Sequence, residues 1–226
     1  MTAMTEQDLI AKYDRMVPRY TSYPTAPHFS PAIGPDDYAA WLAEVPDGAP
    51  LSLYLHIPYC DTMCWFCGCT TKIVNRYEPV KAYLEWLCAE IAMVARTLKT
   101  RHPATYIHWG GGTPTILRSD DILALTDTLR HHFDFAPDGV FAVEIDPREM
   151  TREIVTALAE AGVTRASLGV QDFNPKVQEA INRIQPYEMT KQVVDWLRAD
   201  GIDEINLDLM YGLPYQNEAG IIEAVD

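Results

Sequence analysis

Short apolar runs alternate along the chain with longer segments whose apolar residues recur at helical spacing. The first run, 51–57, alternates apolar and polar residues between prolines and predicts a β-strand. From about 79 to 98, the apolar residues fall on one face of a helix. The same succession then repeats. Further strands are predicted at 105–109, 140–145, 165–170 and 204–210, and helices from near 119, from 151 to 162 and from about 187 to 201.

This order of elements predicts an α/β fold with a parallel sheet, because each strand is followed by a helical crossover. Five such units indicate a β/α barrel that is incomplete, since the last residues, 217–226, lie in what should be the next helix. In β/α barrels the active site lies at the carboxyl ends of the strands. The residues predicted to lie at that edge are His56, Gly111, Glu144, Gln171 and Asp208.

The first 50 residues do not follow this pattern. Five prolines between residues 18 and 35 interrupt any helix, so we expect an extended arm over 1–35 and then a short helix capped by Asp36 or Asp37. The arm carries aromatic residues that are costly to expose together, which favours packing across the mouth of the domain over a solvated tail. The predicted domains are 1–50, the arm and short helix, and 51–226, the barrel.

Composition narrows the choice of partners and compartment. The chain has 226 residues, 48% of them hydrophobic, and a net charge of −14, which argues against a nucleic-acid or acidic-membrane surface. An anionic substrate would have to be held by locally placed Arg and Lys. The N-terminus has no apolar leader region and the sequence has no apolar run of 18 residues, so we expect a cytoplasmic, reducing setting.

Four of the five cysteines fall between residues 60 and 69. The C-x3-C-x2-C spacing of Cys60, Cys64 and Cys67 allows one short loop to wrap around an iron–sulfur cluster. Such a cluster would keep one iron without a protein ligand, whereas ferredoxin-type clusters are held by four thiolates. A zinc site and a disulfide pair are the alternatives, but structural zinc favours two separated pairs of ligands. Cys88 lies on a predicted helix and is interpreted as a small buried hydrophobe.

Other polar and glycine-rich positions have more than one interpretation. The glycines 110–112 let backbone approach a ligand closely, but their spacing is not that of a nucleotide-binding loop. Glu144 and Asp146 could belong to a site, or could cap a helix or pair with Arg148. Asp208 lies inside a predicted strand, so it faces either solvent or the barrel lumen, where a charge needs a partner or ligand.

The cysteine loop, with Phe66 before its third cysteine, resembles the cluster loop of radical S-adenosylmethionine (SAM) enzymes. Within that superfamily, the segments YLHIPYC, CWFCGC, HWGGGTPT, EIDPRE, GVQDFN and DLMYGLP are similar to the oxygen-independent coproporphyrinogen III oxidases of heme biosynthesis. The arm segments YDR and PRYTSYPTA match them too. These oxidases continue well beyond this length, so the resemblance implies an N-terminal portion without the sixth strand and a helical C-terminal domain.

The resemblance implies a radical SAM oxidoreductase that uses one 4Fe–4S cluster and two SAM molecules. A 5′-deoxyadenosyl radical from SAM would start the loss of CO2 from two propionates of coproporphyrinogen III, giving the vinyl groups of protoporphyrinogen IX. The implied partners are coproporphyrinogen III and an unidentified electron donor, without nucleic acid or membrane, and the full-length protein is expected to be a monomer. The alternatives are a heme-binding chaperone with the same cluster and an electron-transfer iron–sulfur protein.

The resemblance also implies site residues. Cys60, Cys64 and Cys67 would hold the cluster, and Cys69, which is phenylalanine in the chaperone, would act in catalysis with Tyr54. Arg15 and Arg19 of the arm are expected to pair with substrate carboxylates, with pairing to local acids such as Asp14 as the alternative. The residues implied to bind SAM are Tyr54, Phe66, Gly111, Gly112, Thr113, Glu144, Gln171, Arg183 and Asp208.

Overall fold

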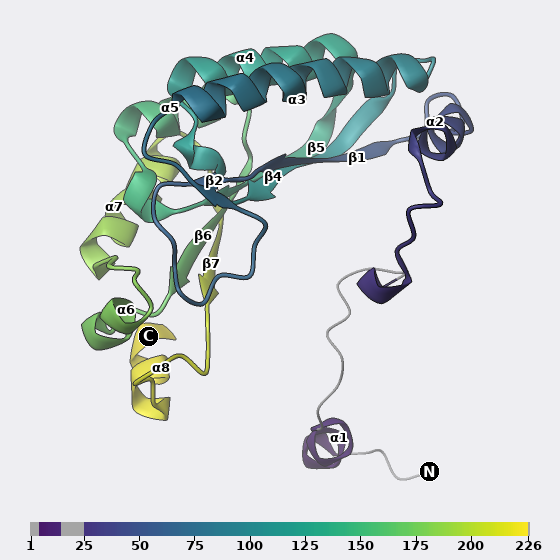
Figure 1. The fold of residues 1–226 in the computed structure, drawn as a ribbon. Coiled ribbons are helices and arrows are strands. Elements are labelled where there is room, and N and C mark those ends of the chain that lie inside the picture. Colours follow the sequence, from purple (N-terminus) through teal and green to yellow (C-terminus); the bar gives the residue numbers. More distant parts are fainter. Residues whose placement is uncertain (1–4, 15–24, 226) are drawn as a thin grey trace. The chain divides into compact units, whose positions relative to one another are not determined.

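The structure, a computed structural model, describes residues 5–14 and 25–225 (Figure 1). The backbone forms two compact units, residues 1–41 and 42–226. The first unit contains the helix α1 (Glu6–Tyr13) and the 3-10 turn η1 (Ala26–His28). A further helix, α2 (Pro35–Ala43), begins in the first unit and ends in the second.

Helix α1 corrects the expectation of an extended arm over residues 1–35. Thr5 caps the helix: its hydroxyl accepts a hydrogen bond from the Asp8 N–H at 3.2 Å, and the Asp8 carboxylate accepts one from the Thr5 N–H at 3.0 Å. This capping box stabilises a helix start. The first proline, Pro18, lies beyond the helix and cannot interrupt it. Tyr13 and Phe29 are 58% and 65% exposed, and packing of the arm across the domain stays a prediction.

The second unit is built on a five-stranded sheet in which every neighbouring pair of strands is parallel. Its strand order, β1-β4-β5-β6-β7, confirms the predicted α/β fold with five successive β/α units. All five predicted strands form, although β5 begins six residues earlier than expected, across Pro137 and Gly139. The strands are β1 (Leu51–Ile57), β4 (Pro103–Gly111), β5 (Asp134–Ile145), β6 (Arg165–Gln171) and β7 (Glu204–Leu209).

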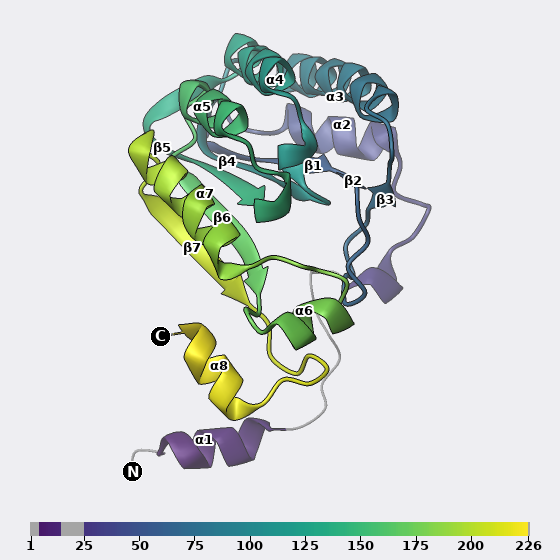
Figure 2. The ribbon, with the colours of Figure 1, turned by 90° about the vertical axis from the view of Figure 1, so that its left-hand side faces the viewer.

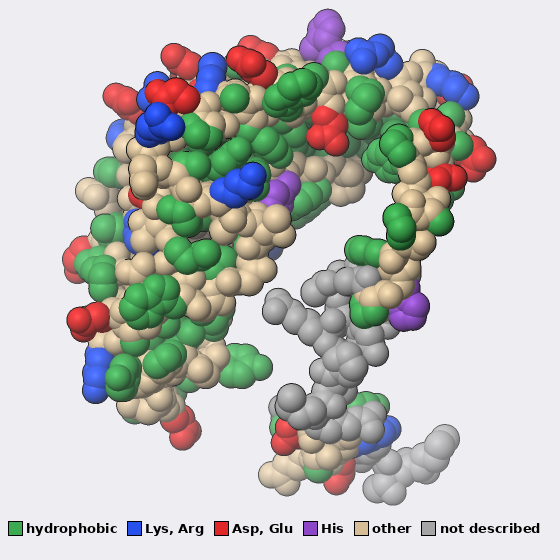
Figure 3. Space-filling model, in the orientation of Figure 1, with side chains coloured by type: hydrophobic (Ala, Val, Ile, Leu, Met, Phe, Trp, Pro, Cys, Tyr) green, Lys and Arg blue, Asp and Glu red, His purple; other side chains and the backbone are tan. Residues whose placement is uncertain are grey.

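Four helices form a layer over one face of this sheet: α3 (Glu78–Thr97) packs on α4 (Ser119–His132), α4 on α5 (Arg152–Ala161), and α5 on α7 (Tyr187–Ala199). Figures 1 and 2 both show α3, α4 and α5 on the same side of the strands. Acidic and basic side chains gather over this layer in Figure 3. Among the described helices, none is long and apolar enough to cross a membrane.

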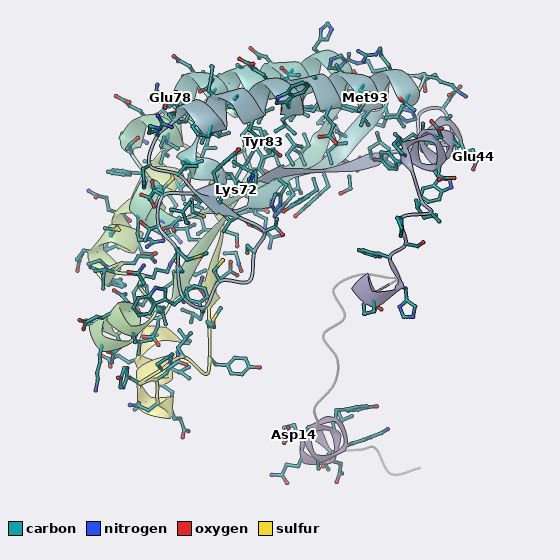
Figure 4. All side chains as sticks on the ribbon, in the orientation of Figure 1. Asp14, Glu44, Lys72, Glu78, Tyr83 and Met93 are labelled. Carbon is teal, nitrogen blue, oxygen red and sulfur yellow. The ribbon has the colours of Figure 1, made fainter. Side chains whose placement is uncertain are left out.

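The pleat of the strands divides apolar from polar side chains. Ile57, Trp109, Val143 and Leu168 are fully buried and belong to the core between the sheet and the helices. From the helical side, the Tyr83 hydroxyl donates a hydrogen bond to a strand carbonyl, that of His56, at 2.6 Å (Figure 4). Successive residues of a strand point to opposite faces. The polar neighbours of the core residues therefore share the other face, where they can form a site.

Several short elements were not predicted from the sequence. The strands β2 (Tyr59–Cys60) and β3 (Lys72–Ile73) pair with each other and close the cysteine-containing loop between them. Helix α6 (Pro175–Ala180) follows β6, and the 3-10 turns η2 (Pro114–Ile116) and η3 (Pro147–Glu149) follow β4 and β5. The last described helix is α8 (Glu218–Val225).

Candidate active site

A cavity of about 270 Å³ lies at the carboxyl ends of the strands and is bordered by the cysteine loop. Tyr54, on β1, is not among the residues that line it, and Arg15 and Arg19 lie outside the described residues. His56, expected at the same edge, does not line it either, but every other residue named from the sequence as a cluster, SAM or catalytic residue does. These residues are Cys60, Cys64, Phe66, Cys67, Cys69, Gly111, Gly112, Thr113, Glu144, Gln171, Arg183 and Asp208.

All four cysteines of the loop are free thiols. Cys64 is buried, Cys60 and Cys67 are half-buried, and Cys69 is exposed. The Cys69 N–H donates to the Cys67 sulfur at 3.5 Å, and the Thr71 hydroxyl donates to the Cys60 sulfur at 3.4 Å. Hydrogen bonds of this kind tune thiolate ligands in metal centres.

Burial raises the pKa of the Cys60 thiol above its ordinary value, and burial together with Cys67 raises the pKa of Cys69 to about 11. A metal removes the proton of a thiol that coordinates it. Within the described part of the chain, no three His, Cys, Asp or Glu side chains are placed to hold a single metal ion.

The segment after α6 anchors the cysteine loop. The Trp65 N–H donates to the Ile181 carbonyl at 3.0 Å, and the Asn182 side-chain amide donates to the Met63 carbonyl at 2.8 Å. Phe66 packs against a small apolar cluster that includes Ile181. Asn182 has a φ of 55°, a left-handed conformation that Asn tolerates better than most residues. Residues remote in sequence thus hold the middle of the loop in place.

The glycine segment at the end of β4 is packed so closely that side chains cannot fit. Gly111 has a φ of 119°, and a Cβ there would lie 2.8 Å from the His56 ring. A Cβ on Gly112 would lie 2.5 Å from the carbonyl oxygen of Tyr59. The Gly112 N–H bonds the Ile57 carbonyl at 2.9 Å, and the Thr113 N–H bonds the Tyr59 carbonyl at 2.8 Å. These glycines therefore bring the end of β4 against the start of the cysteine loop.

Glu144 is oriented by its neighbours on β4. His108 Nε2 lies 3.1 Å from Glu144 Oε1, and the Gly111 N–H donates to Glu144 Oε2 at 3.2 Å. Neither alternative considered from the sequence applies to Glu144, because these contacts make it neither a helix cap nor a partner of Arg148. Tyr54 stacks on the His108 ring with centroids 5.6 Å apart, which places Tyr54 beside the cavity lining.

Asp146, in contrast, has both structural roles. Its carboxylate accepts the Arg148 N–H at 3.0 Å as the cap of η3, and it pairs with the guanidinium groups of Arg148 at 2.7 Å and Arg183 at 2.9 Å. Burial alone would raise the pKa of Asp146, but the hydrogen bonds from Arg148 and the charge of Arg183 hold that pKa below its ordinary value. Both arginines also reach Cys64, so this group of charges belongs to the cavity.

The ends of β6 and β7 complete the lining. Asp208 accepts hydrogen bonds from the Ser167 hydroxyl at 2.8 Å and the Asn206 amide at 2.7 Å. Asp208 lines the cavity, where it has these polar partners, and it is also exposed to solvent. Gln171 has a φ of 68°, which is unusual for a residue other than glycine. Backbone strain of this kind clusters at functional sites.

The family profile of the radical SAM superfamily matches residues 54–226. The chain belongs to the radical SAM superfamily. Oxygen-independent coproporphyrinogen III oxidase from Bradyrhizobium diazoefficiens is 52% identical over 219 residues, covering 96% of this chain and 49% of the relative. The enzyme of that name from Escherichia coli K12 is 42% identical over 208 residues, covering 92% of this chain and 45% of the relative. The chain therefore spans about half the length of these curated relatives.

Solved structures agree with this assignment. Coproporphyrinogen III oxidase from Escherichia coli, described as a radical SAM enzyme, superposes with a TM-score of 0.86 at 37% identity, covering 96% of this chain and 48% of that chain. A radical SAM methyltransferase from Kitasatospora setae superposes with a TM-score of 0.52 at 18% identity, covering 79% of this chain and 33% of that chain. The second likeness concerns the fold alone.

Radical SAM proteins bind a 4Fe–4S cluster and SAM, and the residues of this chain fit both groups. Three thiols on one loop line the same cavity as the closely packed glycines and Glu144. Among the residues that the structure describes, Arg183 Nε, on a side chain that lines this cavity, is a buried donor without a hydrogen-bond partner. The binding of two SAM molecules stays a prediction.

Sequence reasoning missed some residues of this candidate site. His108 is contained in the quoted HWGGGTPT segment but was not assigned to the site, although it contacts Glu144. Its position, two residues before Gly110 on the same strand, was the available signal, because residues two apart share a face. Arg148 was considered only as an ion-pair partner. Ser167, two residues after the start of β6, had no signal of its own in the sequence.

Proposed function

We propose that this chain carries the cluster-binding and SAM-binding part of an oxygen-independent coproporphyrinogen III oxidase. The reaction would decarboxylate two propionates of coproporphyrinogen III oxidatively, giving protoporphyrinogen IX for heme biosynthesis. The observation that carries the proposal is the single cavity that gathers three loop cysteines, the glycine segment and Glu144. Two relatives that carry the name of this oxidase support the proposal, at 52% and 42% identity over nearly the whole of this chain.

In this proposal Cys60, Cys64 and Cys67 ligate the 4Fe–4S cluster. When bound, the cluster and SAM supply the one-electron reductive chemistry that starts the reaction. The chain positions these groups. Glu144, held by His108 and by the backbone of Gly111, presents a fixed carboxylate that suits the amino group of SAM.

The glycine segment 110–112 keeps side chains out of the space between the cysteine loop and β4. Phe66, Gly112, Thr113, Gln171, Arg183 and Asp208 line the same cavity and are proposed to contact SAM. Tyr54 is proposed to act from beside the cavity through its stacking on His108.

The substrate would bring four carboxylates to a protein of net charge −14. Arginine is suited to pair with carboxylates through its planar set of donors. Arg15 and Arg19 are proposed to do so, and both lie outside the described residues. Cys69 is exposed on the cluster loop and lines the cavity, so it is proposed to face the substrate or a second SAM rather than the cluster. The electron donor is unidentified, and a reducing cytoplasm would suit the free thiols.

The test uses the protein at its full cellular length, with the cluster reconstituted, under anaerobic conditions. It measures the formation of protoporphyrinogen from coproporphyrinogen III and, in the same samples, the absorbance of the cluster. Cys64→Ala should abolish the cluster. Cys69→Ser should keep the cluster and lose decarboxylation. Cys88→Ala is the matched control, because Cys88 is a half-buried thiol on α3 that does not line the cavity, and it should leave both signals at the parent level.

Measuring 5′-deoxyadenosine release and SAM binding in the same reactions separates the alternatives. Release of 5′-deoxyadenosine without protoporphyrinogen formation would favour a radical SAM protein with another role. If the reduced, cluster-loaded protein neither releases 5′-deoxyadenosine nor binds SAM, the electron-transfer alternative gains. A Cys64→Ala variant with an intact cluster and parent turnover would contradict the ligand assignment.

A further inference from the structure

Two guanidinium groups contact the sulfur of Cys64. Arg148 Nη2 lies 3.3 Å from this sulfur and Arg183 Nη1 lies 3.4 Å from it. Both arginines also bind the Asp146 carboxylate. The exposed fractions of the side chains are 15% for Arg148, 8% for Arg183 and 11% for Asp146, so water screens these charges weakly.

The charges of this group do not cancel. Arginine stays protonated in proteins, and Asp146 is held as a carboxylate by its two partners. Within this group of three side chains, two positive charges and one negative charge leave a net positive charge, and both positive members contact the Cys64 sulfur. The other two cysteines proposed as ligands have only neutral donors among the described contacts, a hydroxyl of Thr71 for Cys60 and a backbone N–H for Cys67.

We propose that Arg148 is a positioning residue that raises the reduction potential of the cluster through its charged hydrogen bond to the Cys64 sulfur. This inference rests on the cluster of the proposed function and not on the identity of the substrate. The reduction potential of a cluster depends on net charge, on hydrogen bonds to the sulfurs and on solvent exposure. At Cys64 the sulfur accepts charged hydrogen bonds from side chains that are largely buried.

The direction of the effect follows from the charge balance. Reduction adds one electron to the cluster, and no bond is made or broken. The added negative charge spreads onto the cysteine sulfurs, so a nearby positive charge stabilises the reduced form more than the oxidised form. A fixed guanidinium therefore makes reduction of the cluster easier. The cluster must be reduced before it can transfer an electron.

Arg148 is a cleaner target than Arg183. The Arg148 side chain has two partners among the described residues, Asp146 and the Cys64 sulfur. Arg183 also donates to the Gly169 carbonyl at 2.7 Å and is proposed to contact SAM. A change at Arg183 would therefore alter several functions together.

The experiment measures the midpoint potential of the reconstituted cluster by electron paramagnetic resonance, with dithionite as the added reductant. Arg148→Met removes the charge and should shift the potential to lower values. Arg148→Lys keeps the charge on a different donor and should shift it less. Asp146→Asn removes the opposing negative charge, keeps a residue that can cap η3, and should shift the potential in the opposite direction.

Arg152→Met is the matched control. Arg152 also pairs with an aspartate, Asp200, but it lies on α5 and does not line the cavity. Its replacement removes one positive charge from the protein and should leave the midpoint potential unchanged. A purely structural role for Arg148 would lower cluster content without producing opposite shifts at Arg148 and Asp146.

Equal midpoint potentials for Arg148→Met, Asp146→Asn and the parent would overturn the proposal. If Arg148→Met assembles no cluster, the shift of Asp146→Asn decides alone, with an upward shift in support and no shift against. Failure of the parent protein to assemble a cluster would instead overturn the proposed function, so the two failures are distinguishable.

Discussion

Replacing Gly112 with alanine should disturb the cluster loop from its first cysteine. The new Cβ would lie 2.5 Å from the Tyr59 carbonyl oxygen and 2.6 Å from the Thr71 hydroxyl. An ordinary carbon–oxygen contact is about 3.3–3.6 Å, so one of the two backbones must move by roughly 1 Å. The obstacle is a backbone atom of the residue before Cys60, and it cannot yield by changing a rotamer.

The cost can be worked from these contacts. Forcing an extra methyl group into a packed site costs about 1–3 kcal/mol. The movement also strains the hydrogen bonds that join Gly112 to Ile57 and Thr113 to Tyr59, at 2.9 and 2.8 Å, and losing one costs about 1 kcal/mol. We therefore expect the free energy of unfolding to fall by about 2–4 kcal/mol. Because Tyr59 precedes Cys60, cluster assembly should fall too.

The assay compares Gly112→Ala with Gly68→Ala by denaturant unfolding and by cluster absorbance after anaerobic reconstitution. Gly68 lies on the same loop, but a Cβ there would meet no atom within 4 Å. Gly68→Ala should therefore stay close to the parent in both measurements. A Gly112→Ala variant that matches the Gly68→Ala variant in stability and cluster content would refute the reasoning.

Two further predictions concern stability. Asp121→Asn should lower the free energy of unfolding by about 1–3 kcal/mol at neutral pH, because the buried carboxylate accepts hydrogen bonds from Tyr77 and Lys81. Burial alone would raise the pKa of Asp121, but these bonds hold that pKa below the ordinary value of 3.8. The stability difference between Asp121→Asn and the parent should therefore shrink as the pH falls through the lowered pKa. A stability difference that stays the same in acid would contradict this. Gln178→Ala should cost about 2–4 kcal/mol and speed amide hydrogen exchange around residues 172–186, because this buried side chain makes three hydrogen bonds to the Asp172 and Gln185 backbones. Amide exchange at the parent rate in this segment would contradict the stabilising role of the Gln178 side chain.

Local patterns predicted the elements of the sheet and its helical layer. The apolar periodicities are properties of neighbouring residues, so the strand at 51–57 and the helix from 151 to 162 could be placed within a residue or two. The sequence predicted an element less well where residues that disfavour it lie within or near it. The start of β5 contains Pro137 and Gly139, which argue against a strand, but β5 pairs with β4 on both sides of them, at 134–135 and from 140 on, with a shift in register between. Helix α1 was missed because the prolines beyond it were applied to the whole of 1–35, and its capping box was not considered.

The donor set of the proposed site could also be predicted from the sequence, because three cysteines on one short loop need no tertiary information to be brought together. The parallel order of the units then placed Glu144, Gln171 and Asp208 at one edge of the sheet, and they do share one cavity. Tyr54 stacks on His108 and is not among the residues that line the cavity, so its role in the site stays a prediction.

Only the tertiary structure decided which charged groups meet. Cys64 and Arg148 are 84 positions apart, and Cys64 and Arg183 are 119 apart, yet both guanidinium groups reach the same sulfur. His108 meets Glu144 through the register of β4 with β5. Such contacts depend on strand register, on the pleat and on how the loop is anchored after α6. A pattern of neighbouring residues carries none of that information, because the distance between two side chains remote in sequence is set by everything packed between them.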